Sequence, residues 1–281
     1  MRVDRHESET SSWEVARRPA RTELRPYLMA APEGWAQMRG TTPELREVPF
    51  PGIPLVINIG EPWEVADEPG GQRVAERHDS FLAGLHTRPA LVRGSREWAC
   101  IELRFTPLGT HRLLGIPMHE LANRTVALDD LVPGARELTD RVRDARSWAG
   151  RFDLVERFLL RRLVDSTLPS PGVQWSWEHL RRTHGLAPIG ALADELGWSH
   201  RRLIARFRDQ IGLAPKTLAR VIRFDRAITA LRSPGVRGLA EIALDCGYFD
   251  QAHLNRDFRE LAGTTPTSFL AARLESGGVA A

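Results

Sequence analysis

The sequence predicts an α+β protein: a mixed, β-rich N-terminal domain with two packing helices, followed by an all-helical C-terminal domain. Short apolar and β-branched runs lie between residues 45 and 132, and two amphipathic stretches follow them. Beyond TLPSPG, residues 167–172, every periodic segment is helical. We therefore expect domains at residues 1–168 and 173–275.

Composition places the chain among ordinary globular proteins. Of its 281 residues, 42% are hydrophobic and 27% are charged, which argues against a disordered or fibrous chain. The N-terminal stretch lacks the apolar segment of a secretory signal, and no apolar run has the length that crosses a bilayer. The two cysteines, Cys100 and Cys246, fit neither a disulfide framework nor a zinc site. We expect a cytoplasmic protein without a membrane partner.

Three strand-like runs stand out in the N-terminal domain: Leu55–Ile59, Phe81–Leu85 and Cys100–Phe105. They are short and apolar, and they lie in a region rich in proline and glycine, as strands of small sheets do. We expect them to belong to one small sheet or barrel.

Two helical patterns follow the strand-like runs, at Glu137–Trp148 and Asp153–Val164. The second carries an apolar stripe made of Leu154, Val155, Phe158, Leu159 and Leu163. Such a stripe either packs on the sheet or pairs with a second copy of the chain. A homodimer is therefore one of two open alternatives.

An internal repeat organises the C-terminal domain. IGALADELGW at 189–198 aligns with LAEIALDCGY at 239–248, so that Gly197 matches Gly247. Past the aromatic residue after this glycine, the register slips by one, and Phe207 matches Phe258. Each copy consists of a short helix, a tight turn at a glycine and a second helix, which makes it a helix-turn-helix unit. The second turn is one residue longer than the first.

The second helix of each unit has a narrow apolar stripe. Leu203 and Phe207 in the first copy, and Leu254, Phe258 and Leu261 in the second, point inward. Arg201, Ala205 and Arg208, and in the second copy Ala252, Arg256 and Arg259 with Asn255 beside them, point outward. Arginine can donate two hydrogen bonds to guanine, and asparagine can pair in the same two-bonded way with adenine. We therefore expect double-stranded DNA as the partner.

Two further features agree with this partner. Between residues 172 and 275 the chain has 15 Lys+Arg and 11 Asp+Glu, a small basic excess of the kind that favours a polyanion. Thr217–Leu231 is predicted to form a connecting helix of roughly 22 Å. That length suits two reading helices in successive major grooves, about 34 Å apart, if the duplex bends.

The stretch from about 174 to 273, and above all GYFDQAHLNRDFRELAGTTPTSFL, resembles the AraC/XylS family of bacterial transcription regulators. The likeness rests on the glycine-aromatic turn, the Asp-Gln after it, His253, the Arg256-to-Phe258 spacing, and the closing glycine and Thr-Pro. The resemblance implies a sequence-specific regulator, most often an activator, whose N-terminal domain is a sensor. It also implies RNA polymerase and an unknown small-molecule effector as partners, and no cofactor.

Carried over by position, the base-contacting sites of the family fall on Arg201, Ile204 and Ala205, and on Ala252, His253 and Arg256. His253 is open to a second interpretation, as a hydrogen-bonded turn residue. Lys216 and Arg220 lie near a helix start after Pro215, where a phosphate fits. The full set of expected DNA contacts is Arg201, Arg202, Ile204, Ala205, Arg208, Lys216, Arg220, Ala252, His253, Asn255, Arg256 and Arg259. Ala205 and Ala252 replace longer polar residues of the family, so we expect fewer direct base contacts.

Four interpretations of the N-terminal domain are weighed. Cys100 is a candidate nucleophile, because some family members carry a thiol-based alkyl-transfer domain, but the Pro-Cys-His context of that chemistry is absent. His78, His86, His111 and His119 suggest a metal site, but their spacings match no ligand template. The domain is otherwise a sensor or a purely subunit-pairing unit. We expect no enzyme activity, no catalytic residue and no metal.

Overall fold

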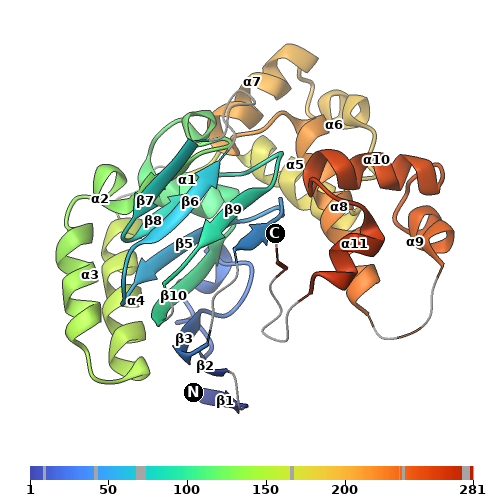
Figure 1. Cartoon of the computed structure of the whole chain (residues 1–281). Helices are drawn as coiled ribbons and strands as arrows, with labels where there is room; N and C mark the ends of the chain where they lie inside the picture. Colours follow the sequence, from blue (N-terminus) through green and yellow to red (C-terminus); the bar gives the residue numbers. More distant parts are fainter. Residues whose placement is uncertain are drawn as a thin grey trace.

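A computed structural model describes residues 1–8, 11–40, 44–67, 74–95, 97–164, 168–233, 235, 238–273 and 279–280. In Figure 1 the strands of the N-terminal half gather on one side of the molecule, and the yellow to red helices of the C-terminal half gather on the other. The α+β class and the order of its two parts are therefore confirmed. Within the described residues, no helix is both long and apolar enough to cross a membrane.

Two antiparallel sheets form the N-terminal half. The larger sheet has the strand order β1-β2-β3-β10-β5-β8-β11, and the smaller one has the order β4-β9-β6-β7. The strands are β1 (Arg2–Glu7), β2 (Ser12–Arg17), β3 (Glu33–Arg39), β4 (Leu45–Glu47), β5 (Ile53–Asn58), β6 (Trp63–Asp67), β7 (Val74–His78), β8 (Phe81–Ala83), β9 (Ala90–Arg93), β10 (Trp98–Phe105) and β11 (Thr125–Ala127). The three runs predicted from the sequence are β5, β8 and β10, which are adjacent in the larger sheet.

Strands β1, β2 and β3 were not predicted. β1 has no buried residue, and in β2 only Val15 and Ala16 are buried, so neither strand has the apolar pattern that marks a core strand. Their charges pair across the strands instead, with Arg5 3.0 Å from Glu14 and Arg17 3.2 Å from Asp4. These partners are 9 and 13 residues apart, and their spacing follows neither a helical nor a strand periodicity.

Helices cover the larger sheet. They are α1 (Pro107–Leu114), α2 (Leu128–Leu131), α3 (Ala135–Asp144) and α4 (Trp148–Val164), with short 3-10 turns η1 (Arg25–Tyr27) and η3 (Met118–Glu120). The predicted helix Glu137–Trp148 extends too far, because Ala145 is extended and ends α3. Trp148 instead starts α4, where its indole N–H donates to Glu14 at 2.8 Å.

The apolar stripe of α4 lies in the core of the chain itself. Val155, Leu159 and Leu163 are buried in the same cluster as Ile53 and Leu103 of the larger sheet. Of the two alternatives for this stripe, packing on the sheet is therefore correct. The stripe gives no support to a homodimer, because three of its five residues are buried and Leu154 and Phe158 are partly buried against the same cluster.

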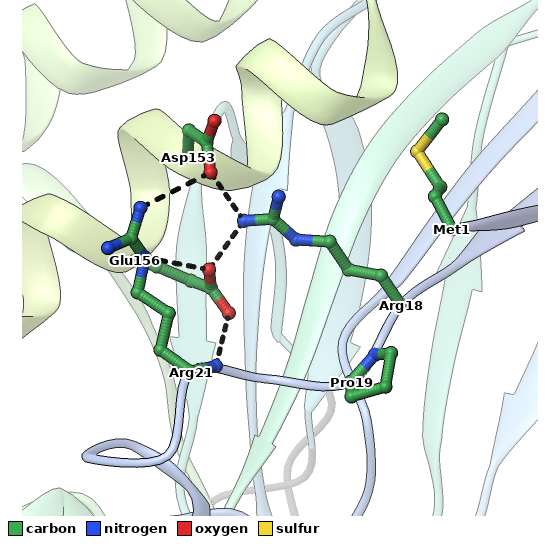
Figure 2. Close-up of a pocket in the computed structure, with 6 residues that line it drawn as sticks. All are labelled: Met1, Arg18, Pro19, Arg21, Asp153 and Glu156. Atoms are coloured by element: carbon green, nitrogen blue, oxygen red, sulfur yellow. Dashed lines mark hydrogen bonds and ion pairs between the residues drawn. The ribbon is translucent and has the colours of Figure 1, made fainter.

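An ion-pair cluster holds α4 to the segment after β2. Figure 2 shows Arg18 and Arg21 converging on Asp153 and Glu156. The Arg18 guanidinium lies 2.8 Å from Asp153 and 2.5 Å from Glu156, and the Arg21 backbone N–H donates to Glu156 at 3.1 Å. The hydrogen bond from Arg18 lowers the pKa of the Asp153 carboxyl. Because Glu156 is buried and two arginines pair with its carboxylate, the cluster is a structural clamp.

Seven helices of the C-terminal half are described. They are α5 (Pro171–Arg182), α6 (Ile189–Glu195), α7 (His200–Gln210), α8 (Pro215–Arg232), α9 (Leu239–Asp245), α10 (Gln251–Leu261) and α11 (Pro266–Ala271). The pairs α6–α7 and α9–α10 are the two predicted helix-turn-helix units, and α8 is the predicted long connecting helix. Residues 165–167, at the proposed domain boundary, lie outside the described part of the chain.

The two units differ in what they pack against. Phe207 and Ile211 of the first unit belong to the same buried cluster as Leu113 and Met118 of the N-terminal half. At Gly212, with φ +105°, an added Cβ would lie 3.0 Å from the Met118 carbonyl oxygen. The second unit has a separate small core with α8 and α11, made of Phe224, Ile242, Leu254, Phe258, Phe269 and their neighbours. The first unit is therefore joined to the N-terminal half.

Candidate nucleic-acid interface

The two turns have the same backbone structure. Gly197 has φ +61° and Gly247 has φ +80°, in the left-handed region that glycine adopts without strain. The N–H of the following aromatic residue donates to the carbonyl of Ala193 in the first turn and of Ala243 in the second, at 2.9 Å in both. The glycine-aromatic pairs are therefore structural counterparts, as the repeat predicted.

The caps of the reading helices explain the slip in register. The Ser199 hydroxyl caps α7 and accepts from the Arg202 N–H at 3.2 Å. The Asp250 carboxylate caps α10 and accepts from the His253 N–H at 2.7 Å. Because Ser199 and Asp250 are equivalent, Phe249 is the additional residue of the second turn.

The predicted inward faces of α7 and α10 are buried. Leu203, Phe207, Leu254 and Phe258 are all fully buried, and Phe258 meets the Phe224 ring of α8 edge-on with the centroids 4.9 Å apart. Two rows of apolar residues therefore fix both helices against the rest of the domain.

The outward face of α7 is open in the whole chain. Arg201, Arg202, Ala205 and Arg208 are exposed, and Ile204 is 38% exposed. The Arg202 guanidinium lies 4.7 Å from the centre of the Trp198 ring. The N-terminal half contacts α7 near its C-terminal end, where Ile211 and Gly212 lie by Met118, and leaves this arginine face uncovered.

The outward face of α10 is more varied. Ala252, Arg256 and Arg259 are exposed, whereas His253 and Asn255 are half-buried. The His253 Nδ1 accepts from the Phe249 N–H at 3.4 Å, so its Nε2 is the ring nitrogen left for a partner. The Asn255 Oδ1 is buried without a partner among the described residues, which limits that amide as a reader of bases.

Lys216 and Arg220 lie on the first two turns of α8, as expected, but their surroundings differ. Lys216 is exposed. The Arg220 guanidinium lies 2.8 Å from Asp257 and also pairs with Glu260, both on α10. Asp257 is buried. Arg220 therefore links α8 to α10, a pairing that its position at a helix start could not indicate.

A cavity of about 500 Å³ lies between the sheets and α8. Four tryptophans are among the residues that line it: Trp13, Trp35, Trp63 and Trp98. Its charged lining residues are Arg46, Glu47, Glu102 and Arg104 from the strands, and Asp225 and Arg232 from α8. Because α8 carries the second helix-turn-helix unit, a molecule in this cavity would touch both halves of the chain.

Two carboxylates that line the cavity lack partners among the described residues. Arg104 donates to Glu102 at 2.7 Å, which pairs those two charges. Within the described residues, no hydrogen bond or ion pair holds the carboxylate of Glu47 on β4 or of Asp225 on α8. Glu47 is exposed, and desolvation raises the pKa of Asp225. The cavity therefore offers polar groups from both halves to a ligand.

The residues weighed for other chemistry have ordinary surroundings. Cys100 is buried, and burial, with the nearby Glu102 charge, raises the pKa of its thiol and keeps it protonated. The His86 ring is held by the Gly84 carbonyl at 2.7 Å and by Asp67 at 3.1 Å. No cluster of three or more metal-binding side chains occurs in the part of the chain that the structure describes.

Two sequence families match parts of the chain. Residues 192–272, from the middle of α6 to the residue after α11, match the family described as a helix-turn-helix domain. Residues 19–127 match a family described as a domain of unknown function, DUF6597. No curated protein matches the chain.

Solved structures are similar to the chain at low identity. Apo ToxT from Vibrio cholerae, in a variant form, is 13% identical, with 95% of this chain and 99% of that chain covered and a TM-score of 0.48. Wild-type ToxT from Vibrio cholerae bound to an unsaturated fatty acid is 11% identical, with 94% and 96% covered and a TM-score of 0.47. The C-terminal domain of AraT, a response regulator from Geobacillus stearothermophilus, is 22% identical, with 38% and 90% covered and a TM-score of 0.36.

The ion pair between α8 and α10 gives a stability prediction. Arg220→Ala leaves the buried Asp257 carboxylate with one charged partner fewer, so it should lower the free energy of unfolding by about 1–3 kcal/mol. Urea unfolding followed by circular dichroism measures this. The double variant Arg220→Ala/Asp257→Ala should recover part of the loss, and Arg256→Ala, at an exposed arginine, should unfold like the unchanged protein. Unchanged stability of Arg220→Ala, with equal loss of affinity for every duplex, would instead make Arg220 a phosphate contact.

Proposed function

The chain belongs to the AraC/XylS family of bacterial transcription regulators, because residues 192–272 are an AraC-type helix-turn-helix domain, and we propose that it reads DNA with α7 and α10 together. As a member it is a DNA-binding transcription regulator. The finer proposal is that α7 and α10 enter two successive major-groove segments on one face of the duplex. The observation that carries it is the doubled unit: two helices capped alike, buried on one side and exposed with their arginines on the other.

The connecting helix supports two contacts by one chain. α8 has 18 residues, a length of about 27 Å, and it packs against both units. One turn of the duplex is about 34 Å. Two reading helices joined in this way reach successive grooves with modest bending of the DNA.

Exposure and position divide the proposed contacts by role. Arg201 and Arg256 lie within the first two turns of their helices and are exposed, which suits them to guanine. Arg208 lies about two turns beyond Arg201, and Arg259 lies about one turn beyond Arg256. Both suit phosphates, as do Arg202 and Lys216. Ile204, Ala205 and Ala252 offer small or apolar surface to base edges, while His253 offers its Nε2 and Asn255 its amide nitrogen.

Ligand response is the second part of the proposal. The cavity has walls from the strands and from α8, so an effector bound there prefers one arrangement of the two halves over another. That preference changes the fraction of molecules able to bind both DNA segments. RNA polymerase and a second copy of the chain remain proposed partners, and activation remains the proposed outcome. No catalytic role is proposed.

Base reading and charge attraction predict different behaviour for Arg256 and Arg259. The full-length protein first selects a duplex from a randomised pool. On that duplex, Arg256→Ala should weaken the free energy of binding by about 1–3 kcal/mol and relax the preference at one base pair. Arg259→Ala should weaken binding to the selected and the random duplex alike. It should also lower the slope of log affinity against log salt concentration by about one. Salt titrations on the selected duplex, its single-base variants and random DNA measure both. Equal loss on every sequence for Arg256→Ala would make it a phosphate contact and leave Arg201 as the main reader.

A larger side chain in the cavity can occupy the space proposed for the unknown effector. Val56→Phe fills part of the cavity and should change the affinity for the selected duplex by about five-fold or more, because the cavity and the DNA-binding units are linked. Met38→Phe, at an exposed position outside the cavity lining, is the matched control and should bind like the unchanged protein. A folded Val56→Phe protein with unchanged affinity would show that the cavity does not regulate DNA binding.

A further inference from the structure

Phe249 is the most exposed large apolar side chain of the described residues, at 86%. It is also the one residue of the second turn without a counterpart in the first. Tyr248 before it corresponds to Trp198, and Asp250 after it corresponds to Ser199. The two units therefore share their framework and differ by an inserted phenylalanine.

The backbone around Phe249 is fixed on both sides. Tyr248 is buried, Asp250 caps α10, and the Phe249 N–H donates to the His253 Nδ1 at 3.4 Å. A residue in this position before a cap often packs on the fourth residue of the helix, here Leu254. Leu254 is already fully buried, and Phe249 remains in water. A held, exposed phenyl ring gains free energy from any partner that covers it.

We propose that Phe249 is a specificity-determining residue that packs on the C5-methyl group of a thymine in the groove read by α10. This rests on the proposed function, in which the start of α10 faces base edges. The thymine methyl is the apolar group of the major groove, and phenylalanine is among the side chains that contact it. Ala252, two residues inside the helix, is small and exposed and leaves room for the approach.

The first unit lacks this feature. Trp198, which precedes the cap of α7, is half-buried and lies under the Arg202 guanidinium at 4.7 Å. The exposed large apolar residue of the first unit is Ile204, which lies inside α7 and is only 38% exposed. The two half-sites are therefore read differently, with a thymine required next to the start of α10.

A protein partner is the competing occupant. Leu244 of α9 is 64% exposed and Leu186 is 47% exposed, and Leu186 lies against Gly247 of the same turn. A partner protein would use these leucines together with Phe249. The thymine contact uses Phe249 alone, because only Phe249 directly precedes the cap of α10.

The test removes one methyl group from the DNA and one ring from the protein. The full-length chain selects a duplex from a randomised pool, and each thymine is then replaced in turn by deoxyuridine. The unchanged protein should lose about four-fold in affinity at one thymine, the worth of one buried methyl group. Phe249→Ala should bind the thymine duplex at least that much more weakly and should not respond to deoxyuridine at that position. Phe249→Leu should keep part of the response.

Leu244→Ala is the matched control, an exposed apolar residue on α9, and should keep both the affinity and the response to deoxyuridine. The proposal is overturned if no replacement affects the unchanged protein, if Phe249→Ala responds as the unchanged protein does, or if Phe249→Ala binds with full affinity. Failure of the proposed function gives a different result, because the full-length chain would then enrich no sequence from the pool. The proposed thymine contact would be contradicted as well.

Discussion

The orientation of α7 and α10 in the C-terminal half is set by the small apolar surface of these two helices. Leu203 and Phe207 in one helix, and Leu254 and Phe258 in the other, are almost the whole of what each helix buries near its middle. Burying an arginine without a partner is costly, so the opposite side of each helix has to remain in water or meet a partner of opposite charge. The arginine faces proposed to read DNA follow from this constraint, and the caps at Ser199 and Asp250 fix where each face begins.

The same constraint decides how the two halves of the chain are connected. The first unit shares its core with η3 and α1, and Ile211 and Gly212 lie against Met118. The second unit depends on α8 and on the pairing of Arg220 with Asp257. α8 also lines the cavity next to the strands. A rearrangement at the cavity therefore reaches the second unit by two routes, through α8 and through Arg46, which lines the cavity and donates to the Ala262 carbonyl at 3.1 Å.

Much of this arrangement could be predicted because its signals are local. The turn glycines, the alternation of buried and exposed residues in α7 and α10, and the three central strands all follow from neighbouring residues. Other features depend on distant partners. The pairing of β1 with β2 is supported by ion pairs and by few buried apolar residues, and the stripe of α4 gave no indication of which surface covers it. Arg220 meets acids 37 and 40 residues away. The exposure of Phe249 follows from an insertion that only the aligned caps locate.

The central claim is that one chain reads two groove segments, and guanine methylation interference on the selected duplex tests it most directly. Methyl groups on guanine N7 block an arginine that donates there. If α7 and α10 both read bases, interfering guanines should form two clusters separated by about 10 base pairs, and Arg201→Ala and Arg256→Ala should each abolish interference in a different cluster. A single cluster, or the loss of the same cluster in both variants, would contradict the account.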